Sequence, residues 1–209
     1  FSTSPIILYR IATPLDSAAT YKLFIINNNT GDTITSQTNI VQSYYVYYPT
    51  LPGTYINFAD TSKITYTCKQ AVNALIYELW MDFYYYEKNI YSGDSVLKKL
   101  EWQIFNNEFG DNILGYSNLS YTLPRHSFYN VLASSIDVNS DVVRTAVGVE
   151  FRWYAGGVEL YDLYLNMLAN LGINEDYISP EYTNIEGGVG MFSSRHTKYI
   201  TDIKLRAAR

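Results

Sequence analysis

The chain has 209 residues, of which 47% are hydrophobic, so it is long and apolar enough to bury a sizeable core. Its formal net charge is -5, and its basic residues are scattered rather than gathered in a stripe, which argues against a nucleic-acid-binding protein. The sequence holds no run of about 18 apolar residues, so we expect no membrane-spanning helix. We expect residues 1–209 to form a single mostly-β domain.

Strand-like segments separated by turn residues make up the first third of the sequence. Apolar runs cover residues 5–10 and 21–26. The second run ends in a polar turn at 27–32, and β-branched residues resume over 33–41, which predicts a β-hairpin. Further strands are predicted over residues 42–48, 55–58 and 64–68, with a turn at Leu51-Pro52-Gly53.

Residues 71–86 fit two patterns. Leu75, Leu79 and Phe83 lie at helical spacing, whereas every second residue from Tyr77 to Tyr85 is large and apolar. The strand interpretation is favoured because the end of the segment is rich in aromatic residues. A turn over residues 88–93 and an alternating segment over 96–105 then predict a second hairpin.

Two helices, separated by a strand over residues 142–154, are predicted near the C-terminal end. Ser127 is the expected N-cap of the first, and its apolar residues recur at helical spacing: Phe128, Val131, Leu132 and Ile136. The second follows Gly156-Gly157 and ends at Gly172, with the apolar stripe Leu160, Leu163, Tyr164, Met167, Leu168 and Leu171. Strands and helices do not alternate regularly. The expected fold class is therefore mainly β (α+β): a β-sandwich or barrel-like antiparallel sheet with two amphipathic helices in the C-terminal half.

Tyrosine is unusually frequent, at 22 residues. Tyrosine suits a strand with one wet face, because its ring packs while its hydroxyl reaches water or a partner. Two clusters are candidate ligand platforms, and alternation predicts that about half of each is buried. Their members are Tyr44, Tyr45, Tyr47 and Tyr48 in the first, and Tyr84, Tyr85 and Tyr86 in the second.

Catalytic and metal-binding patterns are weak, and we expect no catalytic residue, cofactor or metal site. His126 precedes a predicted helix, and His196 has serine neighbours without a nucleophile-elbow motif. Cys68, the only cysteine, fits a small packing residue in a strand. Two carboxylate pairs, Glu78 with Asp82 and Glu159 with Asp162, lie at helical offsets, and the second pair is expected on a solvated helix face. The run at 187–190 is read as a tight turn or bulge against a neighbouring strand.

The segment Tyr182-Thr183-Asn184-Ile185-Glu186-Gly187-Gly188-Val189-Gly190-Met191-Phe192-Ser193-Ser194-Arg195 resembles the C-terminal signature of a Bacteroidetes lipoprotein family, a domain of unknown function. Shorter stretches are also similar to it: Leu8-Tyr9-Arg10 before Thr13-Pro14-Leu15-Asp16, Tyr21-Lys22-Leu23 before Thr30-Gly31, and Phe128-Tyr129 before Ile136. The resemblance implies an extracytoplasmic protein, usually lipid-anchored at the outer membrane and facing the cell surface or periplasm. Members of the family are often encoded near outer-membrane nutrient-uptake machinery. The family brings no catalytic residues, and its lipidated cysteine has no counterpart here, since Cys68 is interior.

The leading functional hypothesis is a non-catalytic cell-surface binding or accessory protein. Its partners would be a glycan, a peptide or an outer-membrane transport complex, and not nucleic acid. The alternative is a structural or adhesive surface subunit, which an exposed apolar edge strand would favour. A hydrolase using remote carboxylates is the third hypothesis.

Overall fold

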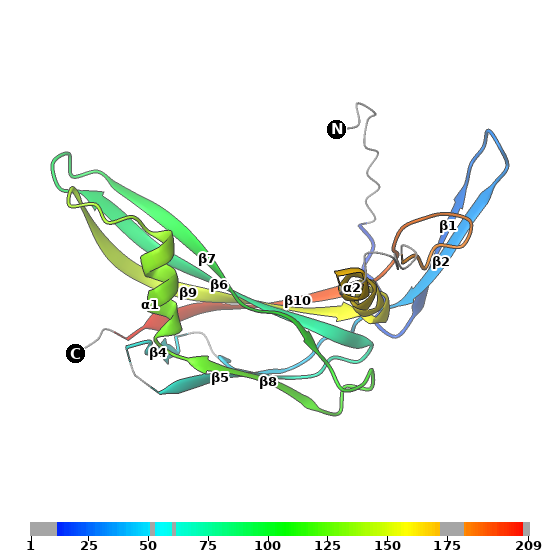
Figure 1. The fold of residues 1–209 in the computed structure, drawn as a ribbon, viewed down its shortest axis with the longest axis horizontal. Helices are drawn as coiled ribbons and strands as arrows, with labels where there is room; N and C mark the ends of the chain where they lie inside the picture. Colours follow the sequence, from blue (N-terminus) through cyan, green and yellow to red (C-terminus); the bar gives the residue numbers. More distant parts are fainter. Residues whose placement is uncertain (1–11, 51–52, 60–61, 172–181, 207–209) are drawn as a thin grey trace.

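The computed structural model describes residues 12–50, 53–59, 62–171 and 182–206. Its strands form three sheets (Figure 1). The five-stranded sheet has the order β4 (Tyr55–Ile56), β10 (Arg195–Leu205), β9 (Val142–Gly157), β6 (Ala74–Asn89) and β7 (Ser95–Phe109). The three-stranded sheet has the order β3 (Val46–Tyr48), β5 (Lys63–Lys69) and β8 (Asn118–Pro124). A separate two-stranded sheet pairs β1 (Thr20–Ile26) with β2 (Thr33–Asn39).

The five-stranded and three-stranded sheets pack face to face as a sandwich, which confirms the predicted fold class. Tyr66 of β5 meets Phe151 of β9 with ring centroids 5.7 Å apart, and Phe105 of β7 meets Tyr121 of β8 at 4.9 Å. Cys68 is fully buried in the same layer, as its strand setting predicts. Neighbours pair antiparallel except for the short parallel contact of β4 with β10.

The strands of the two layers differ greatly in length. β6 and β9 have 16 residues each, whereas β5 and β8 have seven. A 16-residue strand spans about 50 Å, so the large sheet extends far beyond the small one. Figure 1 shows the far ends of β6, β7 and β9 rising away from the small sheet, so the outer face of the large sheet is the concave side.

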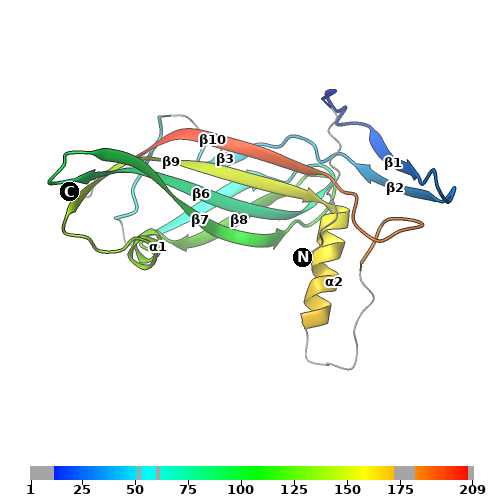
Figure 2. The same ribbon diagram turned by 90° about the horizontal axis from the view of Figure 1, so that it is seen from above.

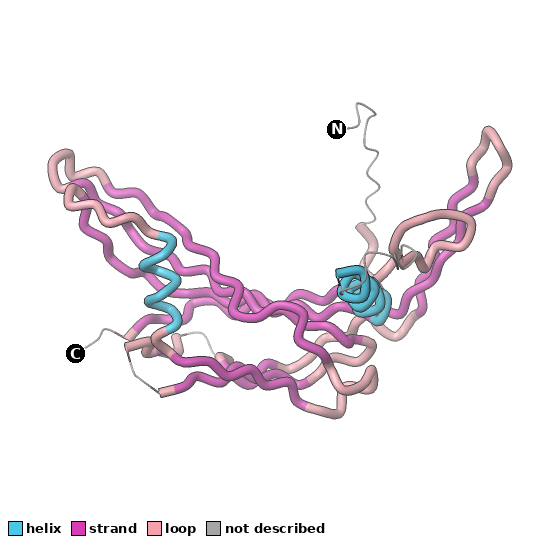
Figure 3. The backbone as a smooth tube through the Cα atoms, in the orientation of Figure 1, coloured by secondary structure: helices cyan, strands magenta, loops and turns pink. Residues whose placement is uncertain are grey.

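Helix α1 (Ser127–Ser135) closes one end of the sandwich, and helix α2 (Val158–Leu171) continues directly from β9 at the other end (Figure 3). Phe128 of α1 is buried against Phe58 and Phe83, at ring-centroid distances of 4.4 and 5.3 Å. The β1–β2 hairpin projects from the body beyond α2. We call this hairpin, residues 20–39, the arm.

The structure confirms both predicted hairpins, both helices and the choice of strand over helix for residues 71–86. Strand 42–48 is shorter than expected, since only Val46–Tyr48 pairs. The Ser127 cap prediction is wrong: His126 is the N-cap residue, without a side-chain cap bond, and Ser127 is already helical. β8 and β10 were not anticipated. Residues 5–10, Leu51-Pro52 and Gly172 lie outside the described residues.

Candidate functional site

The first tyrosine cluster divides between the core and the surface. Tyr44 is buried, edge-on to Tyr77 and His196, and Tyr48 packs against Tyr66. Tyr45 and Tyr47 are 55% and 44% exposed, beside β3 of the small sheet. Their rings lie 5.0 Å apart but are inclined by 65°, so they do not form one flat platform.

The second cluster divides in the same way, along β6 of the large sheet. Tyr85 is buried and stacks on Phe83 at 5.4 Å, whereas Tyr86 is exposed. Tyr84 is half-buried and donates its hydroxyl to Glu150 over 3.2 Å. Burial and the Glu150 carboxylate raise the pKa of Tyr84. The alternation of burial is as predicted, but the exposed rings of the two clusters belong to different sheets.

A different group of side chains gathers on the concave outer face of the large sheet. Alternate residues of β6, β9 and β10 point away from the sandwich, and the strand register aligns them in rows. One row crosses three strands as Trp80, Arg152 and Tyr199. In the next row, Glu78 lies opposite Tyr154. We call this group, with Asp82 and Arg195, the outer-face site.

Arg152 is fixed at the centre of the site by two carboxylates. Its Nη2 donates to Asp82 Oδ1 over 2.7 Å and to Glu101 Oε1 over 2.9 Å. Lys99 Nζ donates to the same Glu101 oxygen over 2.7 Å, and this hydrogen bond lowers the pKa of Glu101. Asp82 is only 4% exposed, and its carboxylate pairs with Arg152 and lies 3.9 Å from Lys99 Nζ, so it is poorly placed as a catalytic acid.

Both arginines of the site lie over aromatic rings. The Arg195 guanidinium carbon is 4.3 Å from the Tyr154 ring centroid, and that of Arg152 is 5.7 Å from Trp80. The indole Nε1 of Trp80 donates to Glu78 over 3.2 Å. Arg195 is exposed and forms no ion pair among the residues that the structure describes. Its donors therefore face solvent beside a fixed ring.

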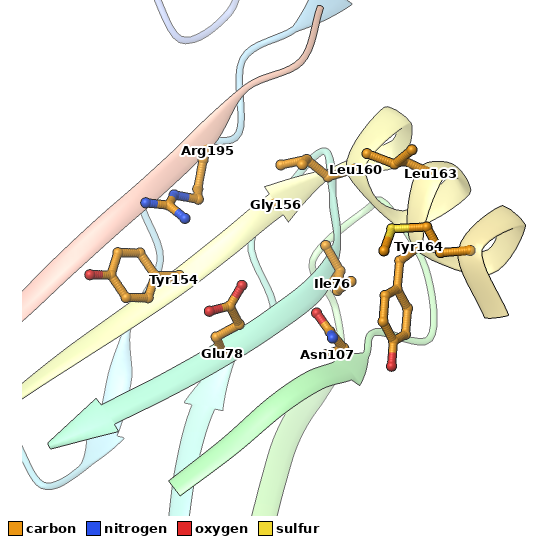
Figure 4. A pocket seen from close by; sticks show the side chains of 10 residues that line it. Ile76, Glu78, Asn107, Tyr154, Gly156, Leu160, Leu163, Tyr164 and Arg195 are labelled. Atoms are coloured by element: carbon orange, nitrogen blue, oxygen red, sulfur yellow. The ribbon is translucent and has the colours of Figure 1, made fainter. Parts of the chain in front are cut away.

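A small pocket of about 160 Å³ opens where the outer face meets α2 (Figure 4). Its apolar wall comes from Ile76, Leu160, Leu163 and Met167, and Glu78, Asn107 and Arg195 supply polar groups. Gly156 permits this geometry, because a Cβ there would lie 2.7 Å from Ile76 Cγ2. Pockets for drug-sized ligands measure about 300–1,000 Å³, so this one fits a single end group.

Comparisons with protein-family models, curated proteins and solved structures find no match to this chain. The resemblance of residues 182–195 to the lipoprotein family therefore stays a prediction. In the described part of the chain, no helix is long and apolar enough to cross a membrane. The function has to be inferred from the residues of the site.

The other sequence candidates have structural contacts. His196 is half-buried against Tyr44, and burial, with the Lys198 charge, lowers its pKa. Glu159 was expected on a solvated helix face, but it is half-buried and accepts a hydrogen bond from Ser193 over 2.8 Å. Burial and the Glu159 charge raise the pKa of Asp162. No group of three or more His, Cys, Asp and Glu side chains within the described ranges could hold a metal.

Gly187 begins the predicted tight turn at residues 187–190. Its φ of 78° is left-handed, and a Cβ there would lie 2.8 Å from the Thr33 carbonyl oxygen of β2. The turn therefore packs closely against the arm, as its glycines predict.

Sequence reasoning missed the outer-face site, although part of the signal was present. In β6, the residues between Leu79, Met81 and Phe83 are Trp80 and Asp82, so the outer face of the strand carries an aromatic ring and a carboxylate. In β9, Arg152 and Tyr154 alternate with the buried Phe151 and Trp153 in the same way.

Proposed function

We propose that this chain is a non-catalytic binding protein that takes a carbohydrate on the concave outer face of its large sheet. The observation that carries the proposal is the pair of arginine–aromatic contacts, Arg152 with Trp80 and Arg195 with Tyr154, set side by side among carboxylates. A sugar presents apolar C–H surfaces and closely spaced hydroxyls. Aromatic rings and charged planar groups offer the complementary surfaces.

The polar groups of the site support a ligand with many hydroxyls. Glu78 and Asn107 line the pocket together with Tyr154 and Arg195, whose guanidinium group lies over the Tyr154 ring. Carboxylate oxygens accept hydrogen bonds from hydroxyls, the guanidinium group donates, and an amide does both. Asn107 is held with φ of 54°, a left-handed conformation that asparagine tolerates, at an irregularity between β6 and β7.

The test is a glycan-array screen followed by calorimetric titration of the best ligand. We expect Tyr154→Ala and Arg195→Gln each to weaken binding about tenfold or more, as truncation of an anchor does. Tyr45→Ala and Tyr47→Ala are matched controls, because they remove exposed rings from the other sheet and should leave affinity unchanged.

Three outcomes would contradict this proposal. Binding that depends on Tyr45 or Tyr47 and not on Tyr154 would place the ligand at the small sheet. If the glycan panel gives no ligand but a peptide array does, and that binding depends on Tyr154 and Arg195, the ligand is a peptide and not a carbohydrate. Failure of both panels would remove the binding function.

The location belongs to the same proposal. The resemblance of residues 182–195 supports an extracytoplasmic protein, anchored by lipid at the outer membrane and assisting nutrient uptake. Membrane fractionation of the native organism, with protease treatment of intact cells, tests this location. A structural or adhesive subunit is the second candidate, and the exposed edge of the arm favours it.

A further inference from the structure

The outer edge of the arm has no partner strand in the part of the chain that the structure describes. β2 is covered on its far side, where Thr35 and Glu186 exchange backbone hydrogen bonds of 3.0 and 2.8 Å. β1 pairs with β2 along its whole length, and no other described strand pairs with it. Figure 2 shows β1 on the outer side of the arm. An open edge of this kind is a template for another strand.

The hydrogen bonds between β1 and β2 determine which backbone groups of β1 point to the open edge. The Asn27 amide donates to the Asp32 carbonyl over 2.9 Å, so that pair is hydrogen-bonded. Hydrogen-bonded pairs alternate along an antiparallel ladder, so Tyr21, Leu23 and Ile25 exchange bonds with β2. The amide and carbonyl groups of Thr20, Lys22, Phe24 and Ile26 therefore point to the open edge.

The arm is also apolar where it is exposed. Phe24 and Ile26 are 65% and 52% exposed and lie on one face of β1. β1 contains a single charged residue, Lys22, and β2 contains none. By contrast, the edge strand β7 carries four charged residues, the usual protection of an edge: Lys98, Lys99, Glu101 and Glu108. An isolated two-stranded hairpin is marginally stable, and added strands stabilise it.

We propose that β1 pairs antiparallel with β1 of a second copy of this chain, about a two-fold axis at Leu23. In this register Leu23 faces Leu23, Lys22 faces Phe24 and Tyr21 faces Ile25 of the second copy. The hydrogen-bonded pairs are Lys22 with Phe24 and Thr20 with Ile26, which are the residues whose backbone groups point outward. No like charges meet, and aromatic side chains face a cation and a β-branched residue, both favourable pairs. The result is a continuous four-stranded sheet across two molecules.

Cysteine cross-linking tests the register. The two Leu23 residues would form a non-hydrogen-bonded pair with Cα atoms about 4.5 Å apart, which a disulfide can bridge. We expect Leu23→Cys to form a covalent dimer under mild oxidation. Ile25→Cys is the matched control on the same strand face, because its own copy would be four residues, or about 13 Å, distant. Cys68 is buried and does not contribute.

Sedimentation over a concentration series tests the edge itself. We expect the intact chain to dimerise and Phe24→Pro to abolish dimerisation, because proline removes an amide that points outward and leaves the β1–β2 ladder intact. Phe24→Thr keeps that amide and should retain a weaker dimer. Circular dichroism checks that both variants fold. An intact chain that stays monomeric, equal cross-linking of Leu23→Cys and Ile25→Cys, or a dimer that survives Phe24→Pro would each overturn the proposal.

Discussion

Arg152 and Arg195 both lie over aromatic rings on the outer face, but their charges have different surroundings. Arg152 is bound by Asp82 and Glu101, whereas Arg195 is exposed beside Tyr154. Because carboxylates already hold the guanidinium group of Arg152, this side chain fixes the positions of its neighbours. The guanidinium group of Arg195 has no such partners among the described residues, so its donors can bind a ligand. We therefore assign Arg152 a positioning role and Arg195 a contact role.

Removing Arg152 should expose how strongly the Asp82 carboxylate depends on it. We expect Arg152→Leu to lower the free energy of unfolding by about 2–4 kcal/mol, because it removes the only hydrogen-bonded cation of a buried carboxylate and leaves Lys99 Nζ at 3.9 Å from Asp82 Oδ2 among the described residues. The double variant Asp82→Asn/Arg152→Leu should recover much of the loss. Urea denaturation measures both values. A single-variant loss below about 0.5 kcal/mol, the size of an ordinary surface change, would contradict the buried-pair interpretation.

At the scale of elements, Glu87 of β6 forms ion pairs with both neighbouring strands, β7 and β9, where the three strands project past the sandwich. Its carboxylate accepts from Lys98 of β7 over 2.6 Å and from Arg144 of β9 over 2.8 Å. These two hydrogen bonds, from Lys98 and then Arg144, lower the pKa of Glu87. A carboxyl group with a lowered folded-state pKa stabilises the fold above its unfolded-state pKa, and this contribution is lost as the pH falls through the folded value.

The projecting ends of β6, β7 and β9 should therefore loosen in acid. We expect the protection of amides in residues 86–97 and 142–146, measured relative to their intrinsic exchange rates, to fall once the pH drops below the ordinary glutamate pKa of about 4.3. The loss is complete only below the lowered pKa of Glu87. In Glu87→Gln the same segments should exchange faster at neutral pH, with less dependence on acid. Exchange of the central residues 76–82 is the internal control. Equal pH dependence in both proteins would show that another group controls this end.

At the scale of the whole molecule, Cys68 reports on the separation of the two layers. It is fully buried, and burial raises the pKa of its thiol to about 12. Thiolate is the reactive form, so we expect a thiol reagent to label Cys68 only when the sandwich opens. Under strong-labelling conditions in urea, the labelling rate should equal the unfolding rate seen by circular dichroism. Labelling much faster than unfolding would reveal a local opening of β5.

Much of this fold could be predicted from period-two alternation, as in β6 and β9. β10 escaped notice because Ile200 and Ile203 both face the core across a register shift, where Asp202 has φ of 59°. A three-residue spacing breaks the alternation. β10 also places the polar His196 and Lys198 beside the small sheet, near Tyr44. β8 is short and half-exposed, so its pattern is faint.

The outer-face site could be predicted only in part, for a different physical reason. Trp80, Arg152 and Arg195 come from three strands that are remote in sequence. Each strand has an outer face that carries aromatic or charged side chains. The register that aligns these three faces depends on how β6, β9 and β10 pair with one another, which the sequence of a single strand does not contain. The tyrosine clusters stand out in the sequence because their residues are close together along the chain. In a strand, however, consecutive side chains point to opposite faces, so such a cluster does not form one surface.

The parallel contact of β4 with β10 has a consequence for how the molecule is made. Tyr55 of β4 pairs with Lys204 of β10. The large sheet therefore cannot be completed until β10, near the C-terminal end of the sequence, has been synthesised. During synthesis, β9 would leave the ribosome before its neighbour β10 and keep an unfilled side. Contacts between remote segments slow folding, and unpaired strands attract other chains meanwhile. We therefore expect the large sheet to form slowly and only after β10 is synthesised. Until then, the unpaired edge of β9 can bind other nascent copies of the chain.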